Sequence, residues 1–165
     1  MAKKLTTKEL VEKIEKLTKS KIASESVVSL DRFRETQKKA GPRTLLIIED
    51  EETMRKALQR IFELEGYILK LAADAMELSK VLDDSPIDMI LIDVGLPWVN
   101  GFELAQLIKE HKDLKQIPLI FISALNSQED MKKAFEIGAD DFIKKPFDIE
   151  KLKKTVRVLL KLSEN

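Results

Sequence analysis

Hydrophobic and polar positions repeat along residues 44–162 as short apolar runs followed by longer amphipathic stretches. Apolar runs bounded by turn residues predict buried strands, and apolar residues three and four positions apart predict helices packed by one face. The pattern predicts strands at Leu45–Ile48, Tyr67–Ala72, Asp88–Ile92, Ile117–Ile122 and Asp141–Lys144. It predicts helices at Glu52–Leu64, Asp74–Leu82, Phe102–His111, Ser127–Ile137 and Asp148–Leu162.

This alternation of strands and helices with short connections is typical of an α/β domain. Right-handed crossovers then build a parallel sheet that is covered by helices on both faces. The strand at Tyr67–Ala72 carries Lys70 among its apolar residues, so we expect it at an edge of the sheet. We assign residues 42–165 to this domain.

Residues 1–41 have a different character, which predicts a basic helical extension. Thr6 and Glu9 form a capping-box pattern, apolar residues follow at helical spacing, and Gly41 with Pro42 ends the pattern. The segment holds 11 Lys and Arg against 6 Asp and Glu, a net charge of +5 in a chain whose total is zero. Such a segment favours an acidic partner, a nucleic acid or a membrane surface, but a solvated helix surface has the same pattern. Its apolar stripe is expected to pack on the main domain, pair two chains as a homodimer, or bind a partner.

The composition excludes several classes of protein. The chain has no cysteine, which excludes disulfides and thiol catalysis. No apolar run approaches the roughly 18 residues of a membrane span, and the first residues lack the apolar region of a signal peptide. We therefore expect a soluble cytoplasmic protein.

Carboxylates stand where two of the buried strands end. Asp93 follows the apolar run Met89–Ile92, and Glu49 with Asp50 follows the first strand. The carboxyl ends of parallel strands meet at one edge of a sheet, where open α/β sheets bind ligands. If the first and third strands are neighbours, these carboxylates converge and repel one another unless a cation is present. Mg²⁺ suits such a set of oxygen ligands.

Two further polar residues are expected at the same edge. Ser123 follows the fourth strand and Lys145 follows the fifth. This set of groups suits a phosphoryl group bonded to Asp93: it combines carboxylates, a divalent cation, an ammonium and a hydroxyl. The two cations would stabilise charge on the transferring oxygens. A carboxylate is able to act as the nucleophile and form an aspartyl phosphate.

Four motifs in order resemble the receiver domain of two-component response regulators, over roughly Arg43 to Leu162. They are Ile47-Ile48-Glu49-Asp50-Glu51, Leu91-Ile92-Asp93-Val94-Gly95-Leu96-Pro97, Phe121-Ile122-Ser123-Ala124 and Ile143-Lys144-Lys145-Pro146-Phe147. The resemblance implies a flavodoxin-like (βα)5 doubly wound sheet with strand order 2-1-3-4-5. It also implies a cis peptide bond between Lys145 and Pro146, which costs little before proline.

The resemblance assigns roles to the residues at the strand ends. Asp93 is the expected phosphoacceptor. Glu49, Asp50, Asp93 and the backbone carbonyl of Gly95 form the expected Mg²⁺ site, in which Asp50 is expected to bind the ion directly and Glu49 mainly through water. Glu49 departs from the more frequent aspartate by one methylene.

Three more residues take roles through the same resemblance. Ser123 is expected to turn toward the phosphoryl group and Lys145 to pair with it. Phe142 is expected to be the aromatic switch residue, although it lacks the hydroxyl of the common tyrosine. From the sequence we also expect Trp98 and Val99 to expose apolar surface beside the acceptor, as a docking contact.

The expected function is therefore to accept a phosphoryl group from a sensor histidine kinase or a phosphotransfer protein. Phosphorylation would then change the affinity of a docking surface for a downstream protein target. Because the sequence ends soon after the last predicted helix, we expect no output domain and no direct binding of nucleic acid.

Three alternatives come from other classes. A phosphohydrolase of the haloacid dehalogenase type needs a second aspartate two residues after the first, where this chain has Gly95. We therefore do not expect an enzyme. A dinucleotide-binding protein is disfavoured because no glycine-rich loop follows Ile48. An adaptor or scaffold that acts through the N-terminal helical arm, without phosphorylation, stays open.

Overall fold

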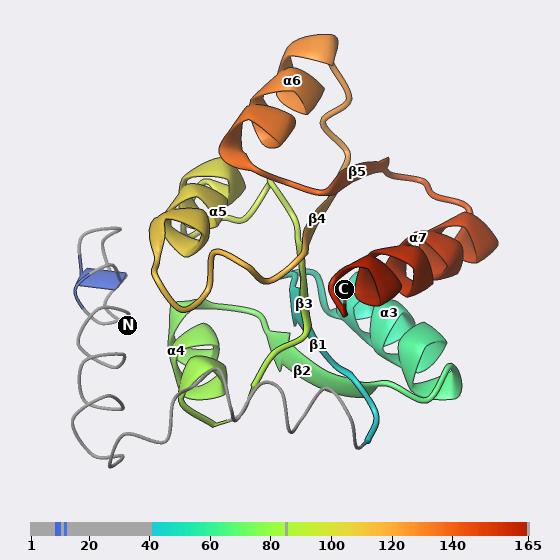
Figure 1. Ribbon diagram of the computed structural model, residues 1–165. Helices are drawn as coiled ribbons and strands as arrows, with labels where there is room; N and C mark the ends of the chain where they lie inside the picture. Colours follow the sequence, from blue (N-terminus) through green and yellow to red (C-terminus); the bar gives the residue numbers. More distant parts are fainter. Residues whose placement is uncertain (1–8, 11, 13–40, 85, 165) are drawn as a thin grey trace.

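The computed structural model describes residues 9, 10, 12, 41–84 and 86–164. Within them, five parallel strands form one sheet in the order β2-β1-β3-β4-β5 (Figure 1). The strands are β1 Thr44–Ile48, β2 Ile68–Ala72, β3 Met89–Ile92, β4 Leu119–Ser123 and β5 Asp141–Lys144. The helices are α3 Glu52–Leu64, α4 Ala75–Asp84, α5 Gly101–Glu110, α6 Gln128–Ile137 and α7 Ile149–Leu162. The predicted fold class and strand order are confirmed.

Helices cover both faces of the sheet, and the core is correspondingly split in two. Apolar residues of α4, α5 and α6 pack with one set of strand side chains, and residues of α3 and α7 pack with the other set (Figure 1). Every residue of β1, β3 and β4 is buried, as expected of strands that lie between two helical layers.

The strand β2 lies at an edge of the sheet, as Lys70 predicted. No other strand of the described residues pairs with its outer side, and Ile68 at its start is 45% exposed. The predicted element bounds differ from the observed ones by one or two residues at several ends. Two ends differ by two residues: α4 continues to Asp84, and β4 begins at Leu119. The start of β4 is later because the Ile117 N–H donates within a turn to the Leu114 carbonyl instead of joining the sheet.

Side-chain caps explain where several helices start. Asp74 accepts from the Glu77 N–H at 2.8 Å, and Ser127 forms a reciprocal capping box with Asp130. Gly138 ends α6 with a positive φ of 110°, a conformation that glycine adopts without strain.

Lys109 lies at the amino-terminal ends of β4 and β5, opposite the end of the sheet where Glu49 and Asp93 follow their strands. Its ammonium donates to the Ile117 carbonyl at 2.8 Å and lies 3.9 Å from the Asp140 carboxylate. Asp140 in turn accepts from the Leu119 N–H at 2.8 Å. Burial lowers the pKa of Lys109, and the charge of Asp140 partly opposes that shift. The group joins α5, the start of β4 and the turn before β5.

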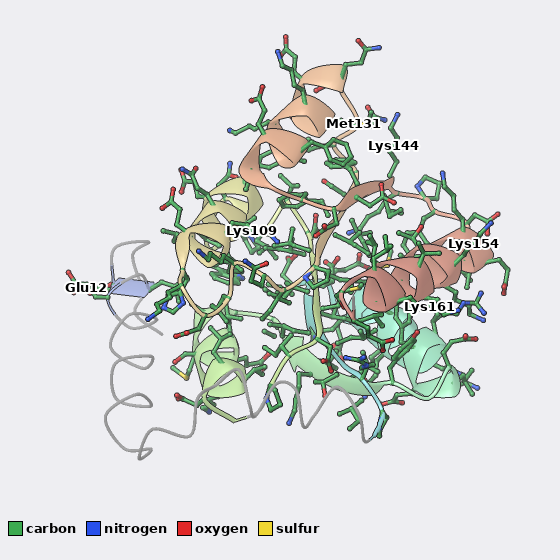
Figure 2. The ribbon with its side chains drawn as sticks, in the orientation of Figure 1. Glu12, Lys109, Met131, Lys144, Lys154 and Lys161 are labelled. Carbon is green, nitrogen blue, oxygen red and sulfur yellow. The ribbon has the colours of Figure 1, made fainter. Side chains whose placement is uncertain are left out.

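Most of the predicted N-terminal extension lies outside the described residues, so that extension and the boundary after residue 41 stay predictions. Glu9, Leu10 and Glu12 are helical. Leu10 is 2% exposed and belongs to the cluster formed with α4 and α5. Glu12 is exposed and points away from the domain (Figure 2). At least one apolar residue of this segment therefore packs against the α/β domain.

Candidate functional site

Three carboxylates converge at the carboxyl ends of β1 and β3. The two strands are paired, with Ile48 opposite Ile92, so the residues that follow them leave the sheet side by side. Oxygen atoms of Glu49, Asp50 and Asp93 lie within 4.8 Å of one another. The predicted convergence is therefore present. Carboxylate oxygens are the ligands that hard divalent cations prefer, so this set fits such a cation.

Lys145 completes the cluster from the far end of the chain. Its ammonium donates to Glu49 Oε2 at 2.9 Å and to Asp93 Oδ2 at 3.1 Å. The Lys145 N–H also donates to the Ser123 carbonyl at 2.9 Å, and the bond to Pro146 is cis, as predicted. One ammonium thus bridges carboxylates that come from two different strands.

Burial and charge set the electrostatics of this cluster. Burial raises the pKa of Glu49, and the charge of Asp93 adds to the rise, against hydrogen bonds from Lys145 and the Glu51 N–H. Burial by itself would lower the pKa of Lys145, but the bond to Glu49 and the charges of Asp93 and Glu49 outweigh it and leave the pKa raised. Lys145 is therefore cationic at neutral pH.

The loop after β3 holds the Asp93 side chain and depends on a glycine. Asp93 Oδ1 accepts from the Gly95 N–H at 3.0 Å. The Gly101 N–H donates to the Val94 carbonyl, and a Cβ at Gly101 would lie 2.4 Å from the Asp93 carbonyl oxygen. Only glycine allows this approach. Asn100 then accepts from the Phe102 N–H and starts α5.

The prediction that Trp98 and Val99 expose apolar surface is wrong for Val99, and Trp98 is only partly exposed. Val99 is 7% exposed and belongs to the core cluster. Trp98 is half-buried against the same cluster, and its Nε1–H donates to the Ala73 carbonyl at 3.0 Å. The loop folds back on the domain because this arrangement buries both side chains and gives the indole a partner.

Ser123 and Phe142 are both buried, on the neighbouring strands β4 and β5. The Ser123 hydroxyl oxygen accepts from the Leu125 N–H at 3.1 Å, and the residue is 1% exposed. Phe142 is 8% exposed, and its ring centroid lies 6.2 Å from that of Phe121. The rings of Phe121 and Phe102 meet edge to face, with their centroids 5.2 Å apart. A movement of Phe142 to the surface would break this aromatic series.

The sequence analysis missed Arg55, which contacts the backbone of the acidic pair. Its Nη1 donates to the carbonyl oxygens of Glu49 and Asp50, both at 3.0 Å. A basic residue in the first turn of a helix is ordinarily a surface residue, so no local pattern distinguished it.

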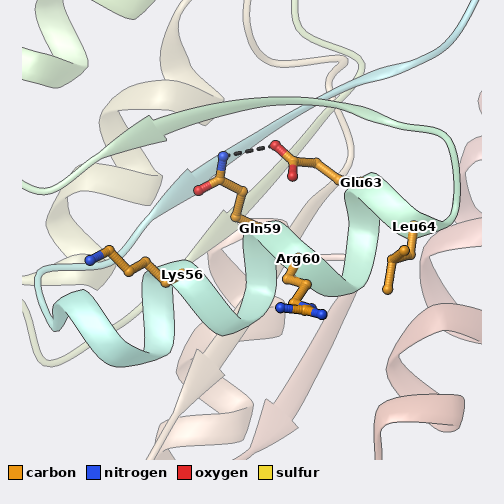
Figure 3. Close-up of a pocket in the computed structure, with 5 residues that line it drawn as sticks. All are labelled: Lys56, Gln59, Arg60, Glu63 and Leu64. Atoms are coloured by element: carbon orange, nitrogen blue, oxygen red, sulfur yellow. Dashed lines mark hydrogen bonds between the residues drawn. The ribbon is translucent and has the colours of Figure 1, made fainter.

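A hollow on the outer surface of α3 is separate from the cluster. It measures about 470 Å³ and is lined by Lys56, Gln59, Arg60, Glu63 and Leu64 (Figure 3). Gln59 donates to Glu63 across it at 2.8 Å (Figure 3). None of the carboxylates of the candidate site reaches this hollow.

Comparison with known proteins identifies the domain. Residues 45–157 match the family of response regulator receiver domains. The chain belongs to this family. The receiver is 36% identical over 121 residues to the aerobic respiration control protein ArcA of Escherichia coli K12, covering 73% of this chain and 50% of ArcA. It is 37% identical over 119 residues to the transcriptional regulatory protein YvrH of Bacillus subtilis, covering 72% of this chain and 49% of YvrH.

Solved receivers share the fold. The receiver domain of a signal transduction histidine kinase from Syntrophus aciditrophicus superposes with a TM-score of 0.65 at 34% identity, over 74% of this chain and 91% of that one. A CheY-like receiver domain protein from Methanospirillum hungatei superposes with a TM-score of 0.67 at 28% identity, over 75% of this chain and 98% of that one. The chain spans about half the length of the curated relatives it matches. Among the described residues of this receiver, no helix combines the length and apolar character needed to cross a bilayer.

Proposed function

We propose that Asp93 accepts a phosphoryl group from a phosphohistidine of a sensor histidine kinase or a phosphotransfer protein. The observation that carries this proposal is the Asp93 carboxylate held between the Lys145 ammonium at 3.1 Å and the acidic residues Glu49 and Asp50. The Asp93 side chain is 12% exposed, so part of it is accessible from solvent.

The transfer forms a bond between an Asp93 carboxylate oxygen and phosphorus while the bond from phosphorus to the donor imidazole nitrogen breaks. The electron pair of that bond returns to the ring nitrogen, and because the other ring nitrogen of the donor carries a proton, the group leaves as neutral imidazole. Lys145 places a positive charge beside the phosphoryl oxygens, and the Gly95 N–H orients the carboxylate. The product is an aspartyl phosphate.

Glu49, Asp50 and Asp93 are the residues that would hold Mg²⁺, with the Gly95 carbonyl as a further ligand. The ion would neutralise charge on the transferring oxygens. The donor set supports this choice, because it offers only oxygen ligands and a net negative charge.

The proposed output is a change in affinity for a downstream protein, with Ser123 turning toward the phosphoryl group and Phe142 repacking. The protein would work in the cytoplasm as a signalling domain. Gly95 occupies the position where a phosphohydrolase of the dehalogenase type carries its acid, which supports a non-enzymatic role. None of the comparisons favours the adaptor alternative.

The test is to add Mg²⁺ and then a small phosphoryl donor such as acetyl phosphate, with intact mass as the readout. We expect one phosphate adduct that requires Mg²⁺ and is absent in Asp93→Asn. An adduct that persists at full stoichiometry in Asp93→Asn would refute the assignment. Glu136→Gln, which changes an exposed carboxylate on α6, is the matched control and should label normally.

A further inference from the structure

The loop between β1 and α3 leaves the sheet at Glu49. The Ile48 carbonyl still accepts from the Asp93 N–H at 3.0 Å, and the Glu49 N–H still donates to the Ala72 carbonyl at 3.1 Å. The next two carbonyls, those of Glu49 and Asp50, lie beyond this strand pairing. A polar backbone group without a partner is costly where water is excluded. Glu49 is buried, so its carbonyl needs a donor, whereas Asp50 is exposed.

Arg55 supplies that donor to both carbonyls. One terminal nitrogen of its guanidinium, Nη1, lies 3.0 Å from the Glu49 oxygen and 3.0 Å from the Asp50 oxygen. A terminal guanidinium nitrogen carries two N–H groups, so each carbonyl receives one of them. The side chain thus fixes the orientation of the two peptide groups that carry the acidic pair.

The position of Arg55 is itself firm. Its own N–H donates to the Glu51 carbonyl at 2.9 Å in the first turn of α3, and the residue is half-buried. A second hydrogen bond within this loop runs from the Glu51 N–H to Glu49 Oε1 at 3.1 Å. That bond uses a carboxylate oxygen of the proposed metal site, whereas the bonds from Arg55 use only backbone oxygens.

We propose that Arg55 is a positioning residue that holds the Glu49 and Asp50 peptides in the geometry the divalent cation requires. This inference rests on the proposed Mg²⁺ site. Supporting residues around a metal site typically change metal affinity 10–100-fold when they are removed. The positive charge of Arg55 by itself would weaken Mg²⁺ binding, because a guanidinium close to the site repels a dication. Removing Arg55 therefore weakens Mg²⁺ binding if the residue positions the loop, and tightens binding if it is only a nearby charge.

The experiment compares the full chain with Arg55→Met, Arg55→Lys and Arg60→Met by Mg²⁺ titration, using Trp98 fluorescence and calorimetry. Arg60 is the matched control, since it lies on the same helix, is exposed, and faces the outer hollow (Figure 3). We expect the Mg²⁺ dissociation constant to rise about tenfold in Arg55→Met. It should change less than about twofold in Arg60→Met. Arg55→Lys, which keeps a donor and the charge, should recover part of the loss.

A second readout works without metal. Amide hydrogen exchange of Glu51 in the metal-free protein should accelerate about fivefold or more in Arg55→Met, while exchange at Ile47 in the middle of β1 stays unchanged. Equal or tighter Mg²⁺ binding by Arg55→Met, or unchanged exchange at Glu51, overturns the positioning role. If the unmodified protein binds no Mg²⁺, the proposed metal site fails, and the exchange experiment alone then decides whether Arg55 holds the loop.

Discussion

The ammonium of Lys145 lies 2.9 Å from a carboxylate oxygen of Glu49, although 96 residues separate them in the chain. The contact forms at the end of a parallel sheet, where residues that follow different strands meet. It matters because burial disfavours the ionised Glu49 and the neighbouring Asp93 repels it. When no metal is bound, Lys145 therefore offsets the repulsion between the carboxylates of Glu49 and Asp93.

Replacing Lys145 by methionine should destabilise the metal-free protein. The change removes two charge-assisted hydrogen bonds and leaves Glu49 and Asp93 to repel each other. We expect a loss of about 1–3 kcal/mol in the free energy of unfolding, measured with urea in the presence of a chelator. Saturating Mg²⁺ should recover part of this loss, because a bound cation also neutralises the carboxylates. Lys144→Met, which replaces an exposed side chain, is the control.

In the same Lys145 variant we expect phosphorylation to be uncoupled from the change in docking surface.

Glu49→Gln should alter how the stability of the metal-free protein depends on pH. The pKa of Glu49 is raised in the folded state above its ordinary value of 4.5. Between those two values the folded protein binds more protons than the unfolded chain, so this group contributes stability at low pH that is lost as pH rises through the folded pKa. Unfolding curves at pH 5 and pH 7 should therefore show a smaller gain on acidification in Glu49→Gln than in the parent. An identical gain in both proteins would show that burial does not raise this pKa.

Gly101→Ala should damage the acceptor loop, whereas Gly95→Ala should not. A Cβ at Gly101 would lie 2.4 Å from the Asp93 carbonyl oxygen and 2.5 Å from Val94 Cα, so the backbone must shift. A Cβ at Gly95 would lie 3.7 Å from Asp93 Oδ1, an ordinary contact. We expect Gly101→Ala to cost about 1–3 kcal/mol in unfolding experiments and to slow labelling of Asp93. Equal stability of the two variants would contradict the close approach seen at Gly101.

Trp98→Phe should loosen the connection between the acceptor loop and the loop before α4. Phenylalanine keeps an aromatic ring but cannot donate to the Ala73 carbonyl as the Trp98 Nε1–H does at 3.0 Å. Loss of this neutral hydrogen bond should cost about 0.5–1.5 kcal/mol. Thermal unfolding followed by circular dichroism measures the loss, since the variant has no tryptophan to report by fluorescence. A variant as stable as the parent would show that the indole bond contributes nothing.

Leu10→Ala tests where the N-terminal segment packs. Leu10 is 2% exposed in the cluster formed with α4 and α5, so its truncation should lower the free energy of unfolding by about 1.5–3 kcal/mol. Glu12→Ala, at an exposed position of the same segment, should have little effect. Light scattering should show the same mass for both variants. A concentration-dependent loss of mass in Leu10→Ala would instead indicate that the segment pairs two chains.

The order of elements, and which residues meet at the strand ends, were determined by the sequence alone. Apolar periodicity is a local property, so the alternating pattern over residues 44–162 was enough to predict the five strands, and Lys70 was enough to predict that β2 lies at an edge. The meeting of Asp93, Glu49 and Lys145 could be predicted because each directly follows a strand, and parallel strands bring such residues to one edge.

Contacts between loops were decided only by the tertiary structure. The indole of Trp98 reaches Ala73, Val99 is buried, and Arg55 binds the Glu49 carbonyl, and none of these follows from spacing in the chain. The physical reason is that a strand or helix repeats one conformation, whereas a loop takes the conformation that buries its apolar side chains and satisfies its polar groups against whatever segments the fold places beside it.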